Sequence, residues 1–475
     1  MSAATSAESF DVAVIGAGVV GAAIARELGR TRARTLLLEA GSDVGAGTSK
    51  ANTAILHTGY DTKPDTLEAR LVRRGHALLT AYAAEAGIPV ERLGALLIAW
   101  SEEQRAALPG IAAAARRNGY DATRDVSAGE LYAREPALGP GALAALEIPD
   151  ESIICPFTTP LAFATEAVLN GVTLVLEAPV TSVARAPGDA MHVLATPRGA
   201  FRARQVVNAA GLGADEIDRM FGHTRFTVTP RRGELLVFDK LARPLVRHVL
   251  LPVPTPVTKG VLVSPTVFGN VMVGPTAEDL RDKTATETTT EGLRALLAQG
   301  RRVIPALADE EVTAAYVGLR AATEHTDYQI RFHPEQGYVC VGGIRSTGLS
   351  ASMAIAEHVC EGLRDAGVAL TPRDDVRTVR MPNLGEGAAR PYERGALIAE
   401  DSDYGRIVCH CERVTRREIL DATRTPIPAR SLDALRRRTR ATLGRCQGFY
   451  CLAAVTRLLA GATGREVAEL LGTPR

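Results

Sequence analysis

The chain has 475 residues, of which 46% are hydrophobic and 23% are charged, and its formal net charge is +1. This length predicts two or three domains, because a single core rarely grows so large. The near-neutral charge gives no field that would hold nucleic acid or an anionic membrane. The start, MSAATSAESF, is not a secretory signal, and no apolar run reaches the roughly 18–20 residues of a membrane span. We expect a cytoplasmic protein without a transmembrane segment, with peripheral membrane contact through a partner left open.

The first motif follows a short apolar strand predicted over residues 11–15. That strand leads into Gly16-x-Gly18-x-x-Gly21 and then into an Ala-rich helix. Gly16 permits a tight turn, Gly18 lets the backbone approach a pyrophosphate, and Gly21 lets the helix pack closely on the strand. A second strand, TLLLEA, ends at Glu39, which lies at the distance of roughly 20 residues typical of a ribose-binding carboxylate. The pattern predicts a dinucleotide site at the N-terminus of the helix.

Two further stretches repeat the order strand, glycine-rich turn, helix. They are VVNAAGLGAD (206–215) and GYVCVGGIRSTGLSASMAIAEHV (337–359). Neither is a second dinucleotide fingerprint, so nothing indicates a separate nicotinamide domain. The spacing of the three units predicts one cofactor contacted along its length by a discontinuous domain.

Residues 10–370 resemble the FAD-dependent glycerol-3-phosphate dehydrogenase and L-2-hydroxyglutarate oxidase group of the D-amino-acid-oxidase-like superfamily. The resemblance rests on the fingerprint with Glu39 and on GTSKANTAILHTGYD, TPRRGELLVFDK, GNVMVGPTAED, GLRAATEH and GGIRSTGLS. It implies FAD as the cofactor. The FAD contacts that it implies are Thr48, Ser49 and Asn52 along the ribityl chain and pyrophosphate, Val180 on the adenine side, Ala210 and Gly211 at the diphosphate, and Gly343, Gly348 and Leu349 at the flavin end.

The fold class expected from these features is α/β. A Rossmann-type FAD-binding domain should comprise residues 10–90, 151–225 and 335–370. Alternating runs such as GELLVFD and GNVMVG predict antiparallel strands, and the resemblance implies that residues 91–150 and 226–334 form a substrate-binding sheet over the flavin. Residues 371–405 are charged, with scattered Pro and Gly, and we expect a linker there.

Residues 406–475 contain four of the seven cysteines, arranged as Cys409-x-Cys411 and Cys446-x4-Cys451. In a reducing compartment clustered cysteines favour a metal site over disulfides. Four thiolates hold zinc or an iron–sulfur cluster, and the one-residue spacing of the first pair disfavours zinc. The region resembles the [2Fe–2S] domain of the bacterioferritin-associated ferredoxin type, which implies a cluster held by these four cysteines. Zinc and free thiols are the alternatives.

The same region should be a small helical domain. Two helices are predicted over SLDALRRRTR and FYCLAAVTRLLAG, and TRRE (415–418) and TGRE (463–466) have the pattern of a capping box at a helix start. The arginines of this region form either a solvated face or a compensating charge for the cluster: Arg413, Arg436, Arg437, Arg438 and Arg445.

The candidate catalytic residues are two histidines and two arginines. Oxidation of an alcohol needs an acceptor for the hydroxyl proton, and His57 and His325 lie inside family motifs, where lining the flavin pocket is an equally good role. Arg320 and Arg345 are candidates for binding an anionic group. The better-known glycerol-3-phosphate dehydrogenases carry Lys and Pro where this chain has Arg345 and Ala321, a difference that favours a carboxylate substrate.

The combination of cofactors predicts the class of reaction. A flavin takes a hydride, whereas a [2Fe–2S] cluster takes one electron at a time, so we expect electrons to leave for a protein or a quinone rather than for dioxygen. Glycerol 3-phosphate is the first substrate candidate, and L-2-hydroxyglutarate or another 2-hydroxy acid is the second. An amine or imino-acid dehydrogenase, acting on opines or hydroxyproline, and a non-catalytic electron-transfer subunit are the alternatives.

Overall fold

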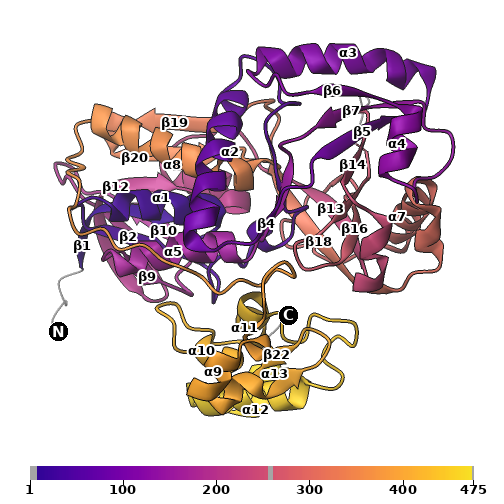
Figure 1. The fold of residues 1–475 in the computed structure, drawn as a ribbon. Helices are drawn as coiled ribbons and strands as arrows, with labels where there is room; N and C mark the ends of the chain where they lie inside the picture. The colour runs from indigo at the N-terminus through magenta and orange to yellow at the C-terminus, as the bar shows by residue number, and fades with distance from the viewer. Residues whose placement is uncertain (1–7, 255–259, 473–475) are drawn as a thin grey trace.

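The computed structural model describes residues 8–254 and 260–472. Figure 1 shows two large units side by side and a small unit, built from the C-terminal residues, beneath them. Each large unit has its own principal β-sheet. Residues 255–259 of the expected substrate-binding domain and residues 473–475 of the expected C-terminal domain lie outside the described residues.

The first sheet has eight strands in the order β10-β11-β12-β1-β2-β9, with β20 beside β12 and β19 beside β20. The bounds are β1 (Ser9–Ile15), β2 (Thr35–Leu38), β9 (Thr173–Val175), β10 (Ser182–Ala184), β11 (His192–Thr196), β12 (Gly199–Asn208), β19 (Gln329–His333) and β20 (Tyr338–Gly342). β1 is parallel to β2 and β12, and β12 is parallel to β20. The carboxyl ends of these strands meet at one edge, where α/β sheets bind their ligands. The three strand–glycine–helix units therefore share one sheet.

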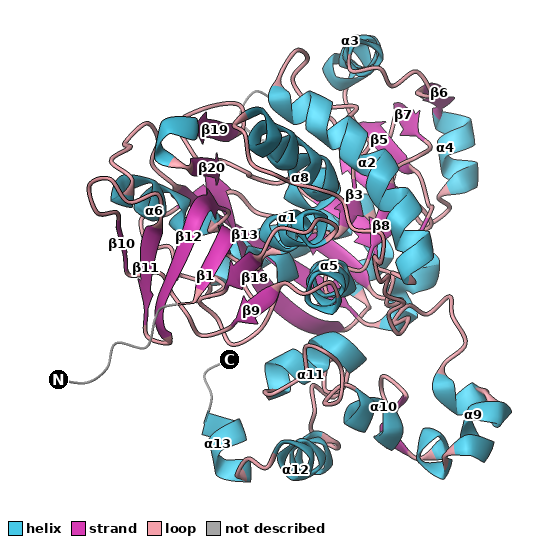
Figure 2. Cartoon of the chain, turned by 90° about the vertical axis from the view of Figure 1, so that its left-hand side faces the viewer, coloured by secondary structure: helices cyan, strands magenta, loops and turns pink. Residues whose placement is uncertain are grey.

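Helices cover both faces of the first sheet. They are α1 (Val19–Gly29), α2 (Leu67–Ala86), α5 (Thr158–Leu169), α6 (Ala214–Met220) and α8 (Gly348–Asp365). α1 contacts α5 and α8, and α2 contacts α8, as Figure 2 shows. Val12 and Val14 of β1 belong to the core on this helical side, whereas Ala13 and Ile15 belong to the core with α6. This alternation follows from the two-residue period of a strand and confirms the predicted α/β class.

The second sheet has nine strands, ordered β17-β13-β16-β15-β14-β5-β7-β6, with β18 on the other edge of β13. The bounds are β5 (Ala95–Ala99), β6 (Arg124–Ser127), β7 (Ala144–Ile148), β13 (Thr229–Phe238), β14 (Val249–Pro252), β15 (Leu262–Pro265), β16 (Val271–Gly274), β17 (Glu278–Asp279) and β18 (Val312–Ala322). All pairs are antiparallel except β14 with β5. The helices of this unit are α3 (Glu102–Arg117), α4 (Ala128–Arg134) and α7 (Thr290–Val303).

A small third sheet, β3-β8-β4, is formed by strands that alternate in sequence with those of the two large sheets. Its strands are β3 (Ile55–Leu56), β4 (Val90–Glu91) and β8 (Ser152–Ile154). The segment 371–405, expected as a linker, is anchored to both large units through backbone hydrogen bonds. The N–H of Met381 donates to the carbonyl of Ala86, and the N–H of Glu386 donates to that of Val267. The segment ends with the short helix α9 (Gly395–Glu400).

The C-terminal unit has a hairpin and four helices around a core of its own. They are β21 (Ile407–Cys409), β22 (Val414–Thr415), α10 (Arg416–Asp421), α11 (Leu432–Thr439), α12 (Leu452–Thr463) and α13 (Val467–Gly472). The two long helical stretches predicted from the sequence are α11 and α12. In the described part of the chain no helix combines the length and the apolar character that crossing a bilayer requires.

One of the two predicted capping boxes is present and the other is wrong. Thr415 and Glu418 form the reciprocal hydrogen bonds of a capping box at the start of α10. Thr463 instead completes α12, and its hydroxyl donates to the carbonyl of Leu459 at 2.7 Å. Gly464 follows in the left-handed conformation, with φ at 67°. This glycine ends α12, so Thr463 cannot begin the next helix.

Candidate active site and cluster site

The glycine fingerprint joins β1 to α1 through very close backbone packing. Gly16 has φ at 101°, and a Cβ there would lie 2.5 Å from the carbonyl oxygen of Ala209. A Cβ on Gly21 would lie 1.8 Å from the carbonyl oxygen of Gly16. Both positions therefore require glycine. Gly18 is the residue that caps the N-terminus of α1, where N–H groups and the helix dipole favour an anion.

Glu39 lies at the carboxyl end of β2, beside the fingerprint. Its two carboxylate oxygens accept the N–H groups of Ala17 and Gly41, each at 2.7 Å. Burial raises the pKa of Glu39, and the two N–H groups only partly offset this effect. The N–H of Ala178 donates to the carbonyl of Glu39. This hydrogen bond holds the segment that contains Val180 beside the end of β2.

The loop at residues 48–52 lies between α1 and the second sheet. The hydroxyl of Ser49 accepts the N–H of Val19, the first residue of α1, at 2.9 Å. The hydroxyl of Thr48 donates to the carbonyl of Leu319 in β18 at 2.8 Å. The side-chain amide of Asn52 donates to the carbonyl of Ser49. This loop thus holds the end of the fingerprint against β18.

The other expected FAD contacts come from the second and third strand–glycine–helix units. Ala210 lies 3.1 Å from where a Cβ on Gly16 would be, so the turn at Ala210 and Gly211 borders the fingerprint. A Cβ on Gly348, at the start of α8, would lie 3.8 Å from the side chain of Val20 in α1. Leu349 is buried beside it, and Gly343 takes φ of 66° in the preceding turn.

His57 is held between α8 and a buried carboxylate. The ring nitrogen Nδ1 of His57 lies 3.0 Å from Oε2 of Glu151, a residue with no exposed surface. The backbone N–H of His57 donates to the hydroxyl of Ser350. Thr58 donates to the other oxygen of Glu151 through both its N–H and its hydroxyl. The imidazole remains partly accessible, with 23% of the side chain exposed. His325 lies elsewhere, beyond the end of β18, with Nε2 3.0 Å from the carbonyl of Arg225.

Arg320 extends from β18 and is surrounded by backbone carbonyls. Its Nη2 donates to the carbonyls of Thr276 and Arg232, at 2.7 and 3.4 Å. The guanidinium forms no ion pair with any residue in the described ranges. Burial lowers the pKa of Arg320 to about 10, with a smaller contribution from the charge of Arg231, and the charge of Asp279 partly offsets both. Gly318, two residues earlier, packs against the 48–52 loop. A Cβ added at this position would lie 1.9 Å from the carbonyl oxygen of Ala51.

Arg345 has a different environment. Its Nη2 lies 3.0 Å from a carboxylate oxygen of Glu68 and 2.6 Å from the carbonyl of Thr326. The second oxygen of Glu68 accepts the hydroxyl of Thr347 at 2.7 Å. Arg345 is thus neutralised within the protein, whereas Arg320 is not.

The four C-terminal cysteines form two contacting pairs, Cys409 with Cys451 and Cys411 with Cys446. A hydrogen bond from Cys451 lowers the pKa of Cys409 to about 6, and the same contact raises that of Cys451. The N–H of Tyr450 lowers the pKa of Cys446, whereas burial raises that of Cys411. Each pair therefore contains one thiol that ionises readily, as ligation requires.

Comparison with known proteins identifies both parts of the chain. Residues 11–362 match the family model described as FAD dependent oxidoreductase. The chain belongs to this family. Residues 407–461 match the model of the BFD-like [2Fe-2S] binding domain. FAD and a [2Fe–2S] cluster are the cofactors of this oxidoreductase.

Named relatives resemble the oxidoreductase over most of its length. A glycerol 3-phosphate dehydrogenase of Caloramator mitchellensis is 36% identical over 464 residues, which cover 97% of this chain and 96% of that protein. A glycerol 3-phosphate oxidase of Mycoplasma pneumoniae is 30% identical over 360 residues, which cover 74% of this chain and 94% of that protein. The solved structure of the dithionite-reduced L-alpha-glycerophosphate oxidase from Mycoplasma pneumoniae with FAD bound has a TM-score of 0.74 at 28% identity, and it covers 79% of this chain and 99% of that one.

The residues around the fingerprint of the oxidoreductase fit FAD. A Cβ added at Gly47 or Gly211 would meet no protein atom within 4 Å, unlike one at Gly16 or Gly21. Space therefore borders the fingerprint on the side of the 48–52 loop and of the Gly211 turn. A carboxylate at the end of β2 and the N-terminus of α1 border the same fingerprint, which matches the ribose and pyrophosphate of a dinucleotide.

The four cysteines fit the [2Fe–2S] cluster that the second family model describes. They lie in two contacting pairs, and a [2Fe–2S] cluster distributes four thiolates over two irons. Among the described residues, no group of three or more His, Cys, Asp or Glu side chains is placed to hold a single metal ion. Backbone N–H groups of Thr442, Gly448 and Tyr450 point at the sulfurs, and such hydrogen bonds stabilise cluster thiolates.

Several residues of the site had no signal in the sequence. Glu151 and Glu68, the partners of His57 and Arg345, lie in no motif and come close only through the fold. The arginines of the C-terminal region do not share one role: Arg445 is exposed, whereas two others are buried in ion pairs with the main body. Arg437 and Arg438 are buried against Asp43, and Arg445 pairs with Glu311.

Proposed function

We propose that this oxidoreductase is a glycerol 3-phosphate dehydrogenase that passes electrons through its C-terminal cluster to an acceptor protein or a quinone. The observation that carries the substrate class is Arg320, a partly buried guanidinium that forms no ion pair with a described residue and lies on the strand facing the 48–52 loop. A partly buried cation of this kind favours an anionic ligand. The near full-length likeness to a glycerol 3-phosphate dehydrogenase supports phosphate as that anion.

The structure also weakens the sequence argument for a carboxylate substrate. That argument rested on Arg345 and Ala321 standing where related dehydrogenases carry Lys and Pro. Because Glu68 already neutralises Arg345, we assign Arg345 to positioning the turn before α8. Arg320 remains the anion-binding residue, and a Lys-to-Arg difference at position 345 does not then discriminate between phosphate and carboxylate.

We assign the proton-accepting role to His57. A hydrogen bond from Nδ1 to the buried carboxylate of Glu151 fixes the tautomer in which Nε2 is the basic nitrogen. The carboxylate also stabilises the imidazolium that forms when a proton is taken up. His325, beyond the end of β18, is the second candidate.

We propose the FAD contacts assigned from the sequence, and two of them are supported by their position: Ser49 accepts the N–H of Val19 at the start of α1, and Ala210 borders Gly16. When bound, FAD accepts a hydride and the [2Fe–2S] cluster accepts single electrons. We propose that Cys409 and Cys451 hold one iron and that Cys411 and Cys446 hold the other. Cysteines kept reduced in this way suit a cytoplasmic location.

Anaerobic reduction of the flavin tests the substrate. Glycerol 3-phosphate should bleach the flavin absorbance at concentrations where L-2-hydroxyglutarate, glycine and proline do not. Rapid bleaching by L-2-hydroxyglutarate alone would move the assignment to a 2-hydroxy acid. Bleaching only by an amino acid would move it to C–N oxidation, and no bleaching by any donor would support a non-catalytic flavin.

A further inference from the structure

The C-terminal unit contacts the FAD-binding loop through a buried ion cluster. Asp43, four residues after Glu39, has 2% of its surface exposed. Both of its oxygens accept from Arg438, at 2.7 and 2.8 Å, in the two-pronged geometry that guanidinium favours. Arg437 adds a third contact at 2.5 Å. Both arginines belong to α11 and are themselves buried.

This cluster continues into the expected FAD-contacting residues. Arg437 also pairs with Asp433, and Asp433 lies 3.3 Å from the ammonium of Lys50. Lys50 directly follows Thr48 and Ser49 in the FAD loop. On the other side of Asp43, the N–H of Gly45 donates to the carbonyl of Ala17 inside the fingerprint.

The charges of the cluster do not cancel. Three cations, on Lys50, Arg437 and Arg438, face two carboxylates, on Asp43 and Asp433. Burial alone would raise the pKa of Asp43, but the hydrogen bonds and charges of Arg438 and Arg437 outweigh it, so its pKa lies below the usual value and the carboxylate is ionised. These five groups leave one positive charge, and the carboxyl group of Glu39, whose pKa the charge of Asp43 helps to raise, lies near them.

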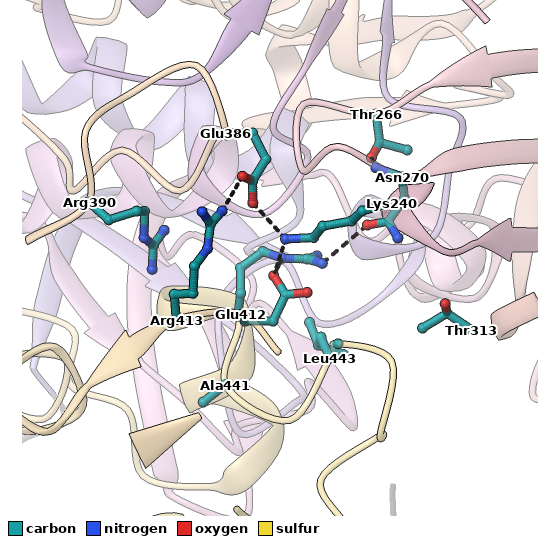
Figure 3. A network of polar contacts seen from close by, with 12 residues as sticks. Lys240, Thr266, Asn270, Thr313, Glu386, Arg390, Glu412, Arg413, Ala441 and Leu443 are labelled. Atoms are coloured by element: carbon teal, nitrogen blue, oxygen red, sulfur yellow. Dashed lines mark hydrogen bonds and ion pairs between the residues drawn. The ribbon is translucent and has the colours of Figure 1, made fainter. Parts of the chain in front are cut away.

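The turn that follows α11 reaches the cysteines. The N–H of Thr442, three residues beyond α11, points at the sulfurs of Cys409 and Cys451. Arg440 pairs with Glu412 at 2.9 Å and lies over the ring of Phe268 in the main body, 4.0 Å from its centre. Figure 3 shows the neighbouring network, in which Lys240 contacts both Glu386 and Glu412. The last turn of α11 therefore contacts the FAD loop, and the residues directly after it contact the cluster ligands.

We propose that the ion cluster of Asp43, Arg437 and Arg438 couples FAD binding to the docking of the C-terminal unit, so that each stabilises the other. Bound FAD orders the 43–50 loop and so presents Asp43 to α11. Docked α11 in turn holds that loop in the conformation that binds FAD. Because linkage is reciprocal, loss of docking must weaken FAD binding by the same factor by which loss of FAD weakens docking.

The test uses the full chain, stripped of FAD and titrated with it, with quenching of FAD fluorescence as the measure of binding. In Arg438→Gln, Arg437 still compensates the charge of the Asp43 carboxylate. This variant should raise the dissociation constant of FAD about tenfold, which is a typical coupling between two sites. In parallel, cleavage of the 371–405 segment by a protease reports docking. FAD should protect this segment in the native chain and should protect it much less in Arg438→Gln.

Arg445→Gln is the matched control, because it removes another arginine that joins the C-terminal unit to the main body, through Glu311. That pair is half exposed, with 49% and 64% of the two side chains accessible, so it contributes little, and the variant should behave like the native chain. If Arg438→Gln loses iron, which shows that its C-terminal unit is unfolded, Arg438→Lys replaces it and should give an intermediate affinity.

Native FAD affinity in Arg438→Gln overturns the proposal, whether or not cleavage accelerates. Weakened affinity without faster cleavage, or an equal loss in Arg445→Gln, overturns it as well. The readouts are FAD binding and proteolysis, so their outcome is separate from the identity of the substrate: the proposed function could fail on glycerol 3-phosphate while this coupling holds.

Discussion

Two arginines that look alike in the sequence have opposite electrostatic situations in the structure. Arg345 forms an ion pair with Glu68. Arg320 donates hydrogen bonds to backbone carbonyls and forms no ion pair with a described residue. Both arginines could be chosen from their motifs. Which of them has its charge available for a ligand could not be predicted, because Glu68 lies 277 positions from Arg345 in the chain.

Arg320→Ala should weaken capture of the anionic substrate without disturbing the flavin. Removing one partner of a buried charged pair costs about 2–5 kcal/mol, so the substrate concentration for half-maximal flavin reduction should rise by at least an order of magnitude. Arg105→Gln is the control, because Arg105 belongs to the same unit but pairs with Glu102 on the exposed surface of α3. Stopped-flow flavin reduction over a range of substrate concentrations measures both. An unchanged concentration dependence in Arg320→Ala would remove this residue from the anion site.

His57→Ala should slow flavin reduction at saturating substrate by a factor on the order of 10²–10⁴, the usual contribution of a positioned base. Glu151→Gln should give a smaller loss, because the imidazole remains but its buried carboxylate partner is gone. His325→Ala should stay close to the native rate. The half-saturating substrate concentration should change little in all three variants. A native rate in His57→Ala, combined with a large loss in His325→Ala, would exchange the two assignments.

At the scale of elements, local signals were reliable where a motif carries its own geometry. The fingerprint, the strand before it and the helix after it were predicted, because Gly16 takes a positive φ and Gly21 lies against the carbonyl of Gly16, and both requirements belong to the motif itself. The capping box predicted from TGRE is wrong because the same residue types also occur where a helix ends. Gly464, in the left-handed conformation, ends α12 directly after Thr463. The burial of Arg437 and Arg438 could not be predicted, since their partner Asp43 belongs to a loop almost four hundred residues earlier.

Replacing one cysteine of either pair should release the metal. Cys446→Ser and Cys409→Ser should both lose iron and acid-labile sulfide, because each leaves one iron with a single cysteine. With FAD supplied in excess, substrate should still bleach the flavin, since these cysteines lie outside the FAD sheet. Analysis of iron, sulfide and zinc in anaerobically prepared protein measures the outcome. Zinc in the native protein, or full iron in both variants, would contradict the paired assignment.

At the scale of the whole molecule, the sequence predicted the parts better than their arrangement. The α/β class, the antiparallel sheet and the helical cysteine-containing unit were expected, but that unit was predicted to fold apart, behind a linker. In the structure the 371–405 segment is hydrogen-bonded along the main body, and α11 is docked on the FAD loop. Such docking depends on charges brought together from distant positions, which no local pattern encodes.

The route from substrate to flavin to cluster is the central claim, and one anaerobic mixing experiment tests it directly. The oxidised full-length protein, with both cofactors bound, is mixed with glycerol 3-phosphate, and flavin absorbance is followed together with the electron paramagnetic resonance of the cluster in frozen samples. We predict that the flavin bleaches first and that the signal of the reduced cluster then grows, whereas in Cys446→Ser only the flavin phase remains. A flavin that glycerol 3-phosphate leaves oxidised, or a cluster that stays oxidised beside a reduced flavin, would contradict the account.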